Sequence, residues 1–267
     1  MNASSPPSAA DTASALRAEI RAGRHTTVTT GLAPGHVQAN LVILPVDWAE
    51  EFAAFCAANP KPCPLIARGA PGDPTLPSLG RDIDVRSDLP RYRVFRNGEV
   101  VSEETDITKL WRDDLVAFAL GCSYSFEAAL LDAGVPIRHI EQGKKVCTYR
   151  TTLDTVPAGR LHGRMVVSMR NFTVANAIRA IEITSRFPRV HGAPIHFGDP
   201  AAIGIADIDK PEFGGEPDIR PGEVPLFWAC GVTPQTVIEA AKPPFCVTHK
   251  AGHMLITDRL NEELREG

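Results

Sequence analysis

The sequence predicts an α/β protein in which helices flank a mixed sheet. Short apolar runs of strand length alternate with segments of helical periodicity along the chain. The pair Asn97-Gly98, set between two short apolar runs, predicts a tight antiparallel hairpin, so an all-parallel sheet is not expected. The apolar fraction of 43% and the charged fraction of 22% are those of a globular protein that buries its own core.

In the first half of the chain, residues 40–45 (NLVILP) form an apolar run of strand length. A helix is expected next, with Asp47 as its N-cap and Glu50 completing a capping-box pattern. The prolines that begin at Pro60 end this helix before Asn59, because proline cannot continue a helix.

The hairpin has its arms at residues 92–95 and 100–101. A helix is expected over residues 107–120, and a second runs from Ser125 to the residue before Gly134.

In the second half, residues 164–169 and 224–230 are predicted strands, and each leads into a predicted helix. Thr173 caps the first of these helices, whose apolar residues recur at helical spacing. Thr233-Pro234 starts the second, since proline is favoured at the first helical position. The last two strands are expected at residues 245–248 and 254–256. The sequence shows no internal repeat.

The chain divides into a short arm and one large unit. Residues 1–15 are rich in Ser, Ala and Pro and predict a disordered N-terminal arm. Residues 16–267 predict a single domain, with two lobes at 16–150 and 151–267 that share one site.

Composition excludes several classes of function. The net charge is -4 and the basic residues form no stripe, so no nucleic-acid partner is expected. No apolar run is long enough for a membrane span, and the N-terminus lacks the pattern of a secretory signal. Six cysteines without a CxxC pair predict free thiols and a cytoplasmic protein with no structural zinc. The expected binding partner is a small-molecule carboxylate, and the sequence is also compatible with a homo-oligomer.

Residues 121–127 (GCSYSFE) place a glycine turn before a helix. Backbone N–H groups at such a helix start suit a carboxylate or an oxyanion, and the hydroxyls of Ser123 and Ser125 add donors. Cys122 adds a thiol. Alternatively, Ser125 is a plain N-cap and Cys122 an unreactive buried thiol.

Residues 189–199 (RVHGAPIHFGD) set His191, His196 and Asp199 among glycines and a proline, which rule out a continuous helix. Two imidazoles and a carboxylate can supply a general base with its orienting partner, or metal ligands. Polar residues this dense among Gly and Pro favour a site. The alternative is a loop held by its own polar side chains.

Asp207 and Asp209 are expected on one face of a short extended segment. They are the candidate ligands for a divalent metal, Mn²⁺ or Mg²⁺, which is the one cofactor that the sequence suggests. The alternative reading makes them carboxylates that cap a turn.

Two further segments end predicted strands. A buried strand that leads through Cys230 and Gly231 to Thr233 at a helix start matches the rule that α/β ligands gather at strand ends. Thr248 and His249 end another strand and are expected to reach the same edge.

Three long segments carry a family resemblance: residues 186–214 (RFPRVHGAPIHFGDPAAIGIADIDKPEFG), 222–235 (GEVPLFWACGVTPQ) and 248–258 (THKAGHMLITD). They resemble the signature region of the bacterial DUF1445 or UPF0317 family, a group of hydro-lyases related to D-glutamate cyclase. The resemblance continues upstream through residues 38–45, 59–65 and 120–127, and so covers nearly all of the chain after the arm.

The resemblance implies an enzyme that eliminates water from a small amino or hydroxy acid; for the cyclase relative, D-glutamate becomes 5-oxo-D-proline. This chemistry requires a base, an acid, donors for an oxyanion and a partner for the α-carboxylate. The candidate catalytic residues are His191, His196, His249 and Asp199. The candidate substrate-binding residues are Cys122, Ser123, Ser125, Arg150, Arg189, Cys230, Gly231 and Thr233.

Two other classes of function stay open. One is a non-catalytic sensor or carrier of small carboxylates, and the other is an acyl hydrolase or transferase that uses Cys122 as its nucleophile.

Overall fold

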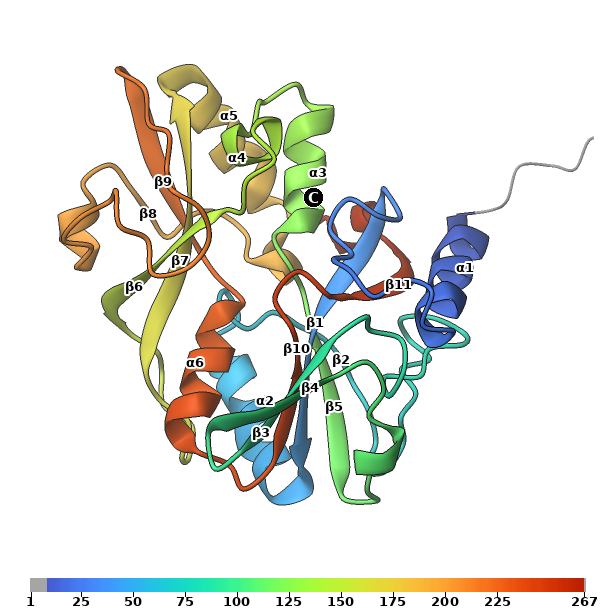
Figure 1. Ribbon diagram of the computed structural model, residues 1–267. Coiled ribbons are helices and arrows are strands. Elements are labelled where there is room, and N and C mark those ends of the chain that lie inside the picture. Colours follow the sequence, from blue (N-terminus) through green and yellow to red (C-terminus); the bar gives the residue numbers. More distant parts are fainter. Residues whose placement is uncertain (1–8, 267) are drawn as a thin grey trace, which may run out of the picture.

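The computed structural model describes residues 9–266 and confirms the α/β class (Figure 1). The strands form two sheets with antiparallel pairing throughout the described residues. The first contains β1 (His36–Pro45), β2 (Leu65–Arg68), β3 (Tyr92–Arg96), β4 (Glu99–Glu104), β5 (Leu115–Leu120), β10 (Cys246–His249) and β11 (Leu255–Leu260). The second contains β6 (Cys147–Asp154), β7 (Arg164–Thr173), β8 (His196–Phe197) and β9 (Glu223–Ala229).

The helices are α1 (Ala9–Arg21), α2 (Val46–Ala58), α3 (Tyr124–Asp132), α4 (Arg138–Glu141), α5 (Val174–Ser185) and α6 (Val232–Ala241). Four 3₁₀ turns accompany them: η1 (Thr108–Leu110), η2 (Pro188–Val190), η3 (Pro200–Ile203) and η4 (Asn261–Leu264). Within residues 9–266, no helix has both the length and the apolar character that a membrane crossing requires.

Most predicted elements are present, with ends that differ by a few residues. The hairpin is β3–β4, and Asn97 and Gly98 have positive φ angles of 52° and 83°, as its tight turn requires. Thr173 caps α5 by accepting a hydrogen bond from the backbone N–H of Asn176 at 3.4 Å. Asp47 instead lies inside the first turn of α2, which no side chain caps.

The helix predicted at residues 107–120 is wrong. This region contains the short turn η1 and then the strand β5, all of whose residues are buried. β5 lies between β1 and β2 in the first sheet. A strand covered on both faces is apolar at every position, so it lacks the alternation that would have distinguished it from a helix.

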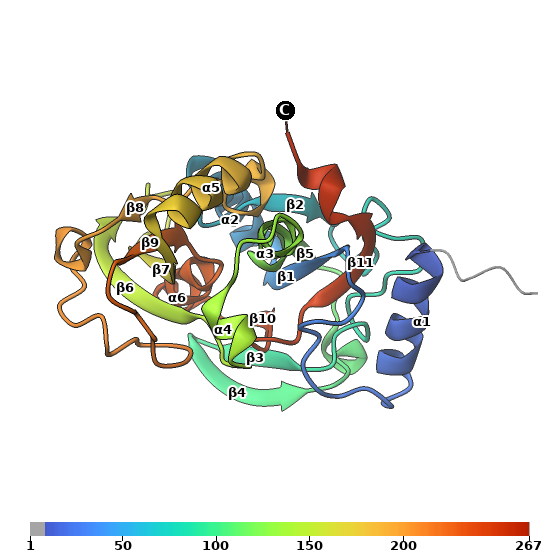
Figure 2. The same cartoon turned by 90° about the horizontal axis from the view of Figure 1, so that it is seen from above.

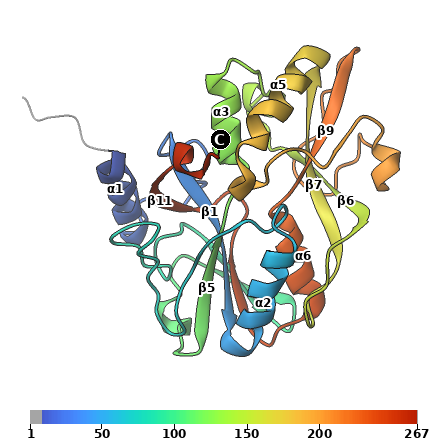
Figure 3. The same cartoon turned by 180° about the vertical axis from the view of Figure 1, so that it is seen from behind.

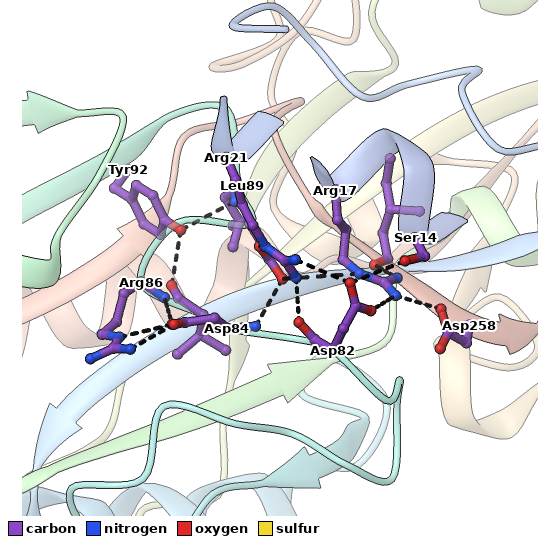
Figure 4. A network of polar contacts seen from close by, with 12 residues as sticks. Ser14, Arg17, Arg21, Asp82, Asp84, Arg86, Leu89, Tyr92 and Asp258 are labelled. Atoms are coloured by element: carbon purple, nitrogen blue, oxygen red, sulfur yellow. Dashed lines mark hydrogen bonds and ion pairs between the residues drawn. The ribbon is translucent and has the colours of Figure 1, made fainter. Parts of the chain in front are cut away.

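The predicted N-terminal arm is wrong from Ala9 onward, where α1 begins; residues 1–8 lie outside the described residues. α1 packs against β11, and Arg17, fully buried, ties the two together (Figure 4). Arg17 donates to the carbonyl oxygen of Ile256 at 3.0 Å and to the carboxylate of Asp258 at 2.6 Å, and it also pairs with Asp82.

Each sheet has one face covered by a pair of helices. In each pair, one helix comes from the first half of the chain and the other from the second half. α2 and α6 lie side by side on the first sheet, where Phe52 and Val237 share a cluster with Phe118 of β5 (Figure 3). α3 and α5 lie on the second sheet, where Phe126 of α3 stacks on Trp228 of β9 at 5.5 Å (Figure 2). α3 follows a strand of the first sheet and α6 a strand of the second, so each helix crosses to the other sheet.

The two halves repeat one order of structural elements, although the sequence shows no internal repeat. β1 and β7 both have 10 residues, and α2 and α5 begin at the next residue. Each half continues with an edge strand (β2 or β8), a central strand (β5 or β9) and a helix (α3 or α6), and β3–β4 is an insertion in the first half. The next strands, β6 and β10, are exchanged between the halves. The sheets therefore have the matching orders β2-β5-β1-β10 and β8-β9-β7-β6.

Candidate active site

Two equivalent turns meet in the middle of the molecule. One leads from β5 through Gly121 and Cys122 to α3, and the other leads from β9 through Cys230 and Gly231 to α6. In Figure 1, α3 rises from the centre and α6 descends from it, so their N-termini face the same region. No side chain caps either helix start. The N–H groups of Ser125 and Thr233 are bonded to the carbonyl oxygens of Cys122 and Cys230, so the remaining N–H groups of each first turn are the donors for an anion.

Both turns require glycine because other groups approach them closely. A Cβ on Gly121 would overlap the carbonyl oxygen of Arg189 and lie 2.8 Å from Cγ1 of Val190. A Cβ on Gly231 would overlap Nδ2 of Asn40. The backbone of η2 therefore excludes a side chain at Gly121, whereas the close neighbour of Gly231 is the side chain of Asn40 on β1.

Arg170, on β7, is the charged centre of the site, and the sequence analysis missed it. It is 3% exposed. Its Nε donates to Glu127 Oε1 at 2.8 Å, Nη1 donates to Ser168 Oγ at 2.8 Å, and Nη2 donates to Ser123 Oγ at 3.2 Å and also to Glu127. Four of its five N–H groups are thus used, and one has no partner among the described residues.

Glu127, in the first turn of α3, balances this cation. Burial alone would raise its pKa, but Arg170 and His139 outweigh burial and hold the pKa below its ordinary value. His139 Nε2 lies 3.4 Å from Oε1. The other oxygen, Oε2, is buried and has no hydrogen-bond partner in the described structure. An unpaired buried acceptor is costly, so it marks a position that a ligand donor would satisfy.

His191 lies against the second turn and is 1% exposed. Its Nδ1 lies 2.7 Å from the carbonyl oxygen of Lys61, so Nδ1 carries the hydrogen and Nε2 keeps a lone pair. Nε2 has no hydrogen-bond partner among residues 9–266. Burial lowers the pKa of His191 to about 4, and the Arg170 cation acts in the same direction. The ring is therefore a neutral base at neutral pH.

His249 contacts the backbone of β1. Its Nδ1 lies 3.2 Å from the backbone nitrogen of Leu41 and 3.4 Å from the carbonyl oxygen of the same residue, so this contact is compatible with either tautomer. Burial lowers the pKa of this imidazole to about 4 as well. His249 closes β10 beside β1 and is neutral there at neutral pH.

His196 and Asp199 are tied to their own loop. His196 Nε2 lies 2.7 Å from the carbonyl oxygen of Asp199, and the Asp199 side chain accepts from the backbone N–H of Ala201 at 3.0 Å. The His196 ring lies 5.7 Å from Phe227, whose side chain is on the face of the sheet opposite Trp228. α3 packs on the Trp228 face, so His196 lies on the other side of the sheet from Arg170.

Cys122 and Cys230 differ from the other cysteines. All six lie in the described part of the chain and are free; four are buried, whereas these two are partly exposed. Burial raises the pKa of Cys122 to about 12 and also raises that of Cys230. Neither is a ready thiolate at neutral pH, which disfavours the reading of Cys122 as an acyl-transfer nucleophile.

The two predicted hydroxyls at the helix starts have different surroundings. Thr233 Oγ1 accepts from the backbone N–H of Val166 at 3.0 Å and donates to its carbonyl oxygen at 3.2 Å, so it is fully used in joining α6 to β7. Ser125 Oγ is buried and has no partner among the described residues.

The predicted arginines and metal ligands lie on the surface. Arg189 is exposed, and so is Arg150, whose guanidinium lies 5.4 Å from the Phe213 ring centre. Asp207 is exposed and pairs with Lys210 at 2.8 Å, and its side chain also accepts from the backbone N–H of Asp209 at 3.1 Å. In the described residues, no three His, Cys, Asp or Glu side chains gather in a metal-binding arrangement.

A small cavity opens beside the site. Its volume is about 20 Å³, close to that of one water, and its lining includes Arg170, His139 and Lys144. The sequence signal that could have identified Arg170 is a single charge inside the apolar run of β7, since a buried charge must be paired.

Comparison with known proteins identifies the family. The family model described as D-glutamate cyclase matches residues 116–258, which include both turns, Arg170 and the three histidines. A Bordetella petrii protein named "Putative hydro-lyase" is 63% identical over 253 residues, covering 95% of this chain and 96% of the relative. Proteins of the same name from Verminephrobacter eiseniae and Methylobacterium radiotolerans are 62% and 54% identical, covering 96% and 97% of this chain and 93% and 95% of the relatives.

Among solved structures, a nitrogen repressor-like protein from Methanococcus jannaschii matches 91% of this chain and 97% of its own chain with a TM-score of 0.38 and 10% identity, a similarity too low to carry a conclusion. The family model and the curated relatives instead agree with each other over the whole site. The chain therefore belongs to the D-glutamate cyclase family, whose curated members are named as hydro-lyases.

Proposed function

We propose that this hydro-lyase removes water from a small amino acid, and that its reaction is the ring closure of D-glutamate to 5-oxo-D-proline. One observation supports the proposal most strongly. The buried guanidinium of Arg170 and the N-terminus of α3 lie near the neutral imidazole of His191, whose Nε2 has no hydrogen-bond partner in the described residues. An amino acid brings a carboxylate for the first two groups and an amine for the third.

The α-carboxylate has a binding position beside Arg170. The unused N–H of Arg170 and the backbone N–H groups at the start of α3 are donors to an anion. Glu127 keeps the guanidinium in place, and its free Oε2 is an acceptor for a substrate ammonium.

His191 then acts as the base. Its Nε2 takes a proton from the substrate ammonium, and the resulting amine attacks the γ-carboxyl carbon. Charge that develops on the γ-carboxyl oxygen lies near the N-terminus of α6, beside Gly231. The two protons that the ammonium loses leave with one carboxyl oxygen as water, so the ring closure consumes no other reagent.

The direct test is turnover. Purified protein is incubated with D-glutamate or L-glutamate, with and without Mn²⁺, and 5-oxoproline is resolved by chiral chromatography. We expect 5-oxo-D-proline from D-glutamate. His191→Asn should lower the rate by about a hundredfold or more, because a general base contributes that much, whereas His162→Asn, at an exposed histidine, should keep the wild-type rate.

Absence of turnover in every condition would overturn the proposal. Glutamate binding by calorimetry without turnover would favour a sensor or carrier instead. Since all six cysteines are free thiols, we also propose that the reaction takes place in the reducing cytoplasm.

A further inference from the structure

Cys122 and Cys230 occupy the same position in the two repeated halves. Each cysteine directly precedes the N-cap of its helix, Ser123 for α3 and Gly231 for α6. Each carbonyl oxygen accepts a hydrogen bond from the backbone N–H three residues further on, at 3.2 Å for Cys122 and 2.9 Å for Cys230. The reciprocal exchange of β6 and β10 shows that an approximate two-fold relation connects the halves, so it also connects these cysteines.

The two cysteines lie close to each other, since burial raises the pKa of Cys122 and Cys230 contributes to that rise. The Asn40 side chain joins the two turns, since its Nδ2 donates to the carbonyl oxygen of Gly121 at 3.4 Å and touches the position where Gly231 would carry a Cβ. Figures 1 and 3 both place the N-termini of α3 and α6 toward each other at the centre of the molecule. Two groups related by a two-fold axis can reach a ligand that lies on the axis from opposite sides, which is the arrangement that two faces of one planar centre require.

Two buried polar atoms in the first turn of α3 lack partners in the described structure. They are Ser125 Oγ and Glu127 Oε2, on residues that are 1% and 2% exposed. In the second half, the hydroxyl equivalent to Ser125 belongs to Thr233 and is fully bonded. Buried polar groups are normally paired, so this asymmetry points to a polar ligand at the start of α3.

We propose that Cys122 and Cys230 form a thiol pair that moves the α-hydrogen of a bound amino acid from one face of its α-carbon to the other. This activity is a racemisation of glutamate, and it rests on the proposed binding of glutamate at the same site.

The proposed proton transfer between Cys122 and Cys230 balances without an oxidant, a reductant or another reagent. One cysteine, after losing its proton to solvent, takes the hydrogen of the α-carbon as a thiolate, and the electron pair of the broken C–H bond stays on the carbon beside the carboxylate. The other thiol donates its proton to the opposite face. One C–H bond breaks, one forms, and thiol and thiolate have exchanged places. Burial raises both thiol pKa values, so the thiolate is a minor form at neutral pH and becomes more abundant as the pH rises. Once formed, it is a strong base, and its partner stays protonated.

Isotope exchange tests the proposal on the wild-type protein. It is incubated with D-glutamate in D₂O, the α-hydrogen is followed by proton NMR, and the two hands are separated by chiral chromatography. We expect L-glutamate to form and to carry deuterium, while the remaining D-glutamate keeps its hydrogen at early times. Two thiols on opposite faces of the α-carbon produce this difference in deuterium content between L-glutamate and D-glutamate. No exchange of the α-hydrogen, or equal deuterium in both enantiomers, would overturn the proposal.

Variants assign the two roles. Cys122→Ala and Cys230→Ala should each lower the exchange rate by about a hundredfold or more. Cys246→Ala is the matched control, because Cys246 is a buried thiol on β10 that packs in the cluster with Phe52 and Phe118, outside both turns, and it should keep the wild-type rate. Exchange that survives in both single variants at the wild-type rate would contradict the assignment.

The same samples separate this proposal from the ring closure. Formation of 5-oxoproline without exchange would refute the thiol pair alone, and exchange without 5-oxoproline would refute the cyclase reaction alone. Melting curves of the variants identify loss of fold, and the isotope pattern of the wild type stands independently of them.

Discussion

Arg170 shows how much of the site depends on the shape of one side chain. Its planar guanidinium reaches Glu127, Ser123 and Ser168 at once, which an ammonium group cannot do. We expect Arg170→Lys to lower kcat/KM by about tenfold to a hundredfold, equivalent to about 1.4 to 2.7 kcal/mol, because bidentate charge-assisted bonds are lost. Arg150→Lys is the control, since that arginine is exposed over Phe213, and it should change kcat/KM less than twofold. Steady-state kinetics of both variants measure the difference in kcat/KM. A larger loss for Arg150→Lys than for Arg170→Lys would show that Arg170 is not part of the site.

The buried histidines make stability depend on pH. Burial lowers the pKa of His191 and of His249 to about 4, whereas an unfolded histidine has an ordinary value near 6.5. Between these values the unfolded chain binds more protons, so stability is complete above about pH 6.5, falls as the pH drops toward 4, and then levels off. The full effect is on the order of 3 kcal/mol for each histidine.

Urea unfolding at pH 7, 6 and 5 measures this dependence. We expect the free energy of unfolding to decrease at each step, and His249→Asn to flatten the decrease over the same range. An equal slope in the variant would show that His249 titrates normally.

At the scale of elements, local sequence patterns predict the two glycine turns, whereas the positions of β5 and β7 depend on pairing between strands that are distant in the sequence. Glycine before a helix start is a local pattern, so the sequence identified the segments around Gly121 and Gly231 as parts of a site. Nothing local places β7 beside α3, and therefore Arg170 could not be paired with Glu127 from the sequence. β5 was mistaken for a helix for the related reason that its burial depends on strands from distant parts of the chain.

The attachment of helix α1 to the rest of the protein also depends on contacts between elements. Arg17 is fully buried and faces several carboxylates, including Asp82 and Asp258 (Figure 4). Arg17→Met should lower the free energy of unfolding by about 1.5 to 3 kcal/mol, because the partly exposed carboxylates of Asp82 and Asp258 lose a charge-assisted hydrogen bond from Arg17. Arg24→Met removes an exposed pair with Glu19 and should leave stability unchanged. Chemical denaturation of both variants makes the comparison, and equal stability would show that packing alone holds α1.

At the scale of the whole molecule, the exchanged strands make the two halves depend on each other. β10, from the end of the chain, lies between β1 and β3 in the first sheet, and β11 also pairs with β1. The second sheet in turn depends on α3 of the first half, whose Phe126 and Leu130 cover it. Neither half contains a complete core, so a single cooperative unfolding transition is expected.

Splitting the chain tests this dependence. A break in the exposed turn after Gly143 gives fragments 1–143 and 144–267. The first fragment lacks β10 and β11, so it exposes strand edges of β1 and β3. The second fragment retains β6-β7-β9-β8 and α5 but lacks α3, the other helix that covers this sheet. Each fragment alone should show no cooperative melting by circular dichroism. Mixing them should restore the melting transition, because the break severs no sheet hydrogen bond and leaves both turns intact. A cooperative transition in either isolated fragment would mean that the halves are independent lobes, with a site assembled by docking rather than by exchange.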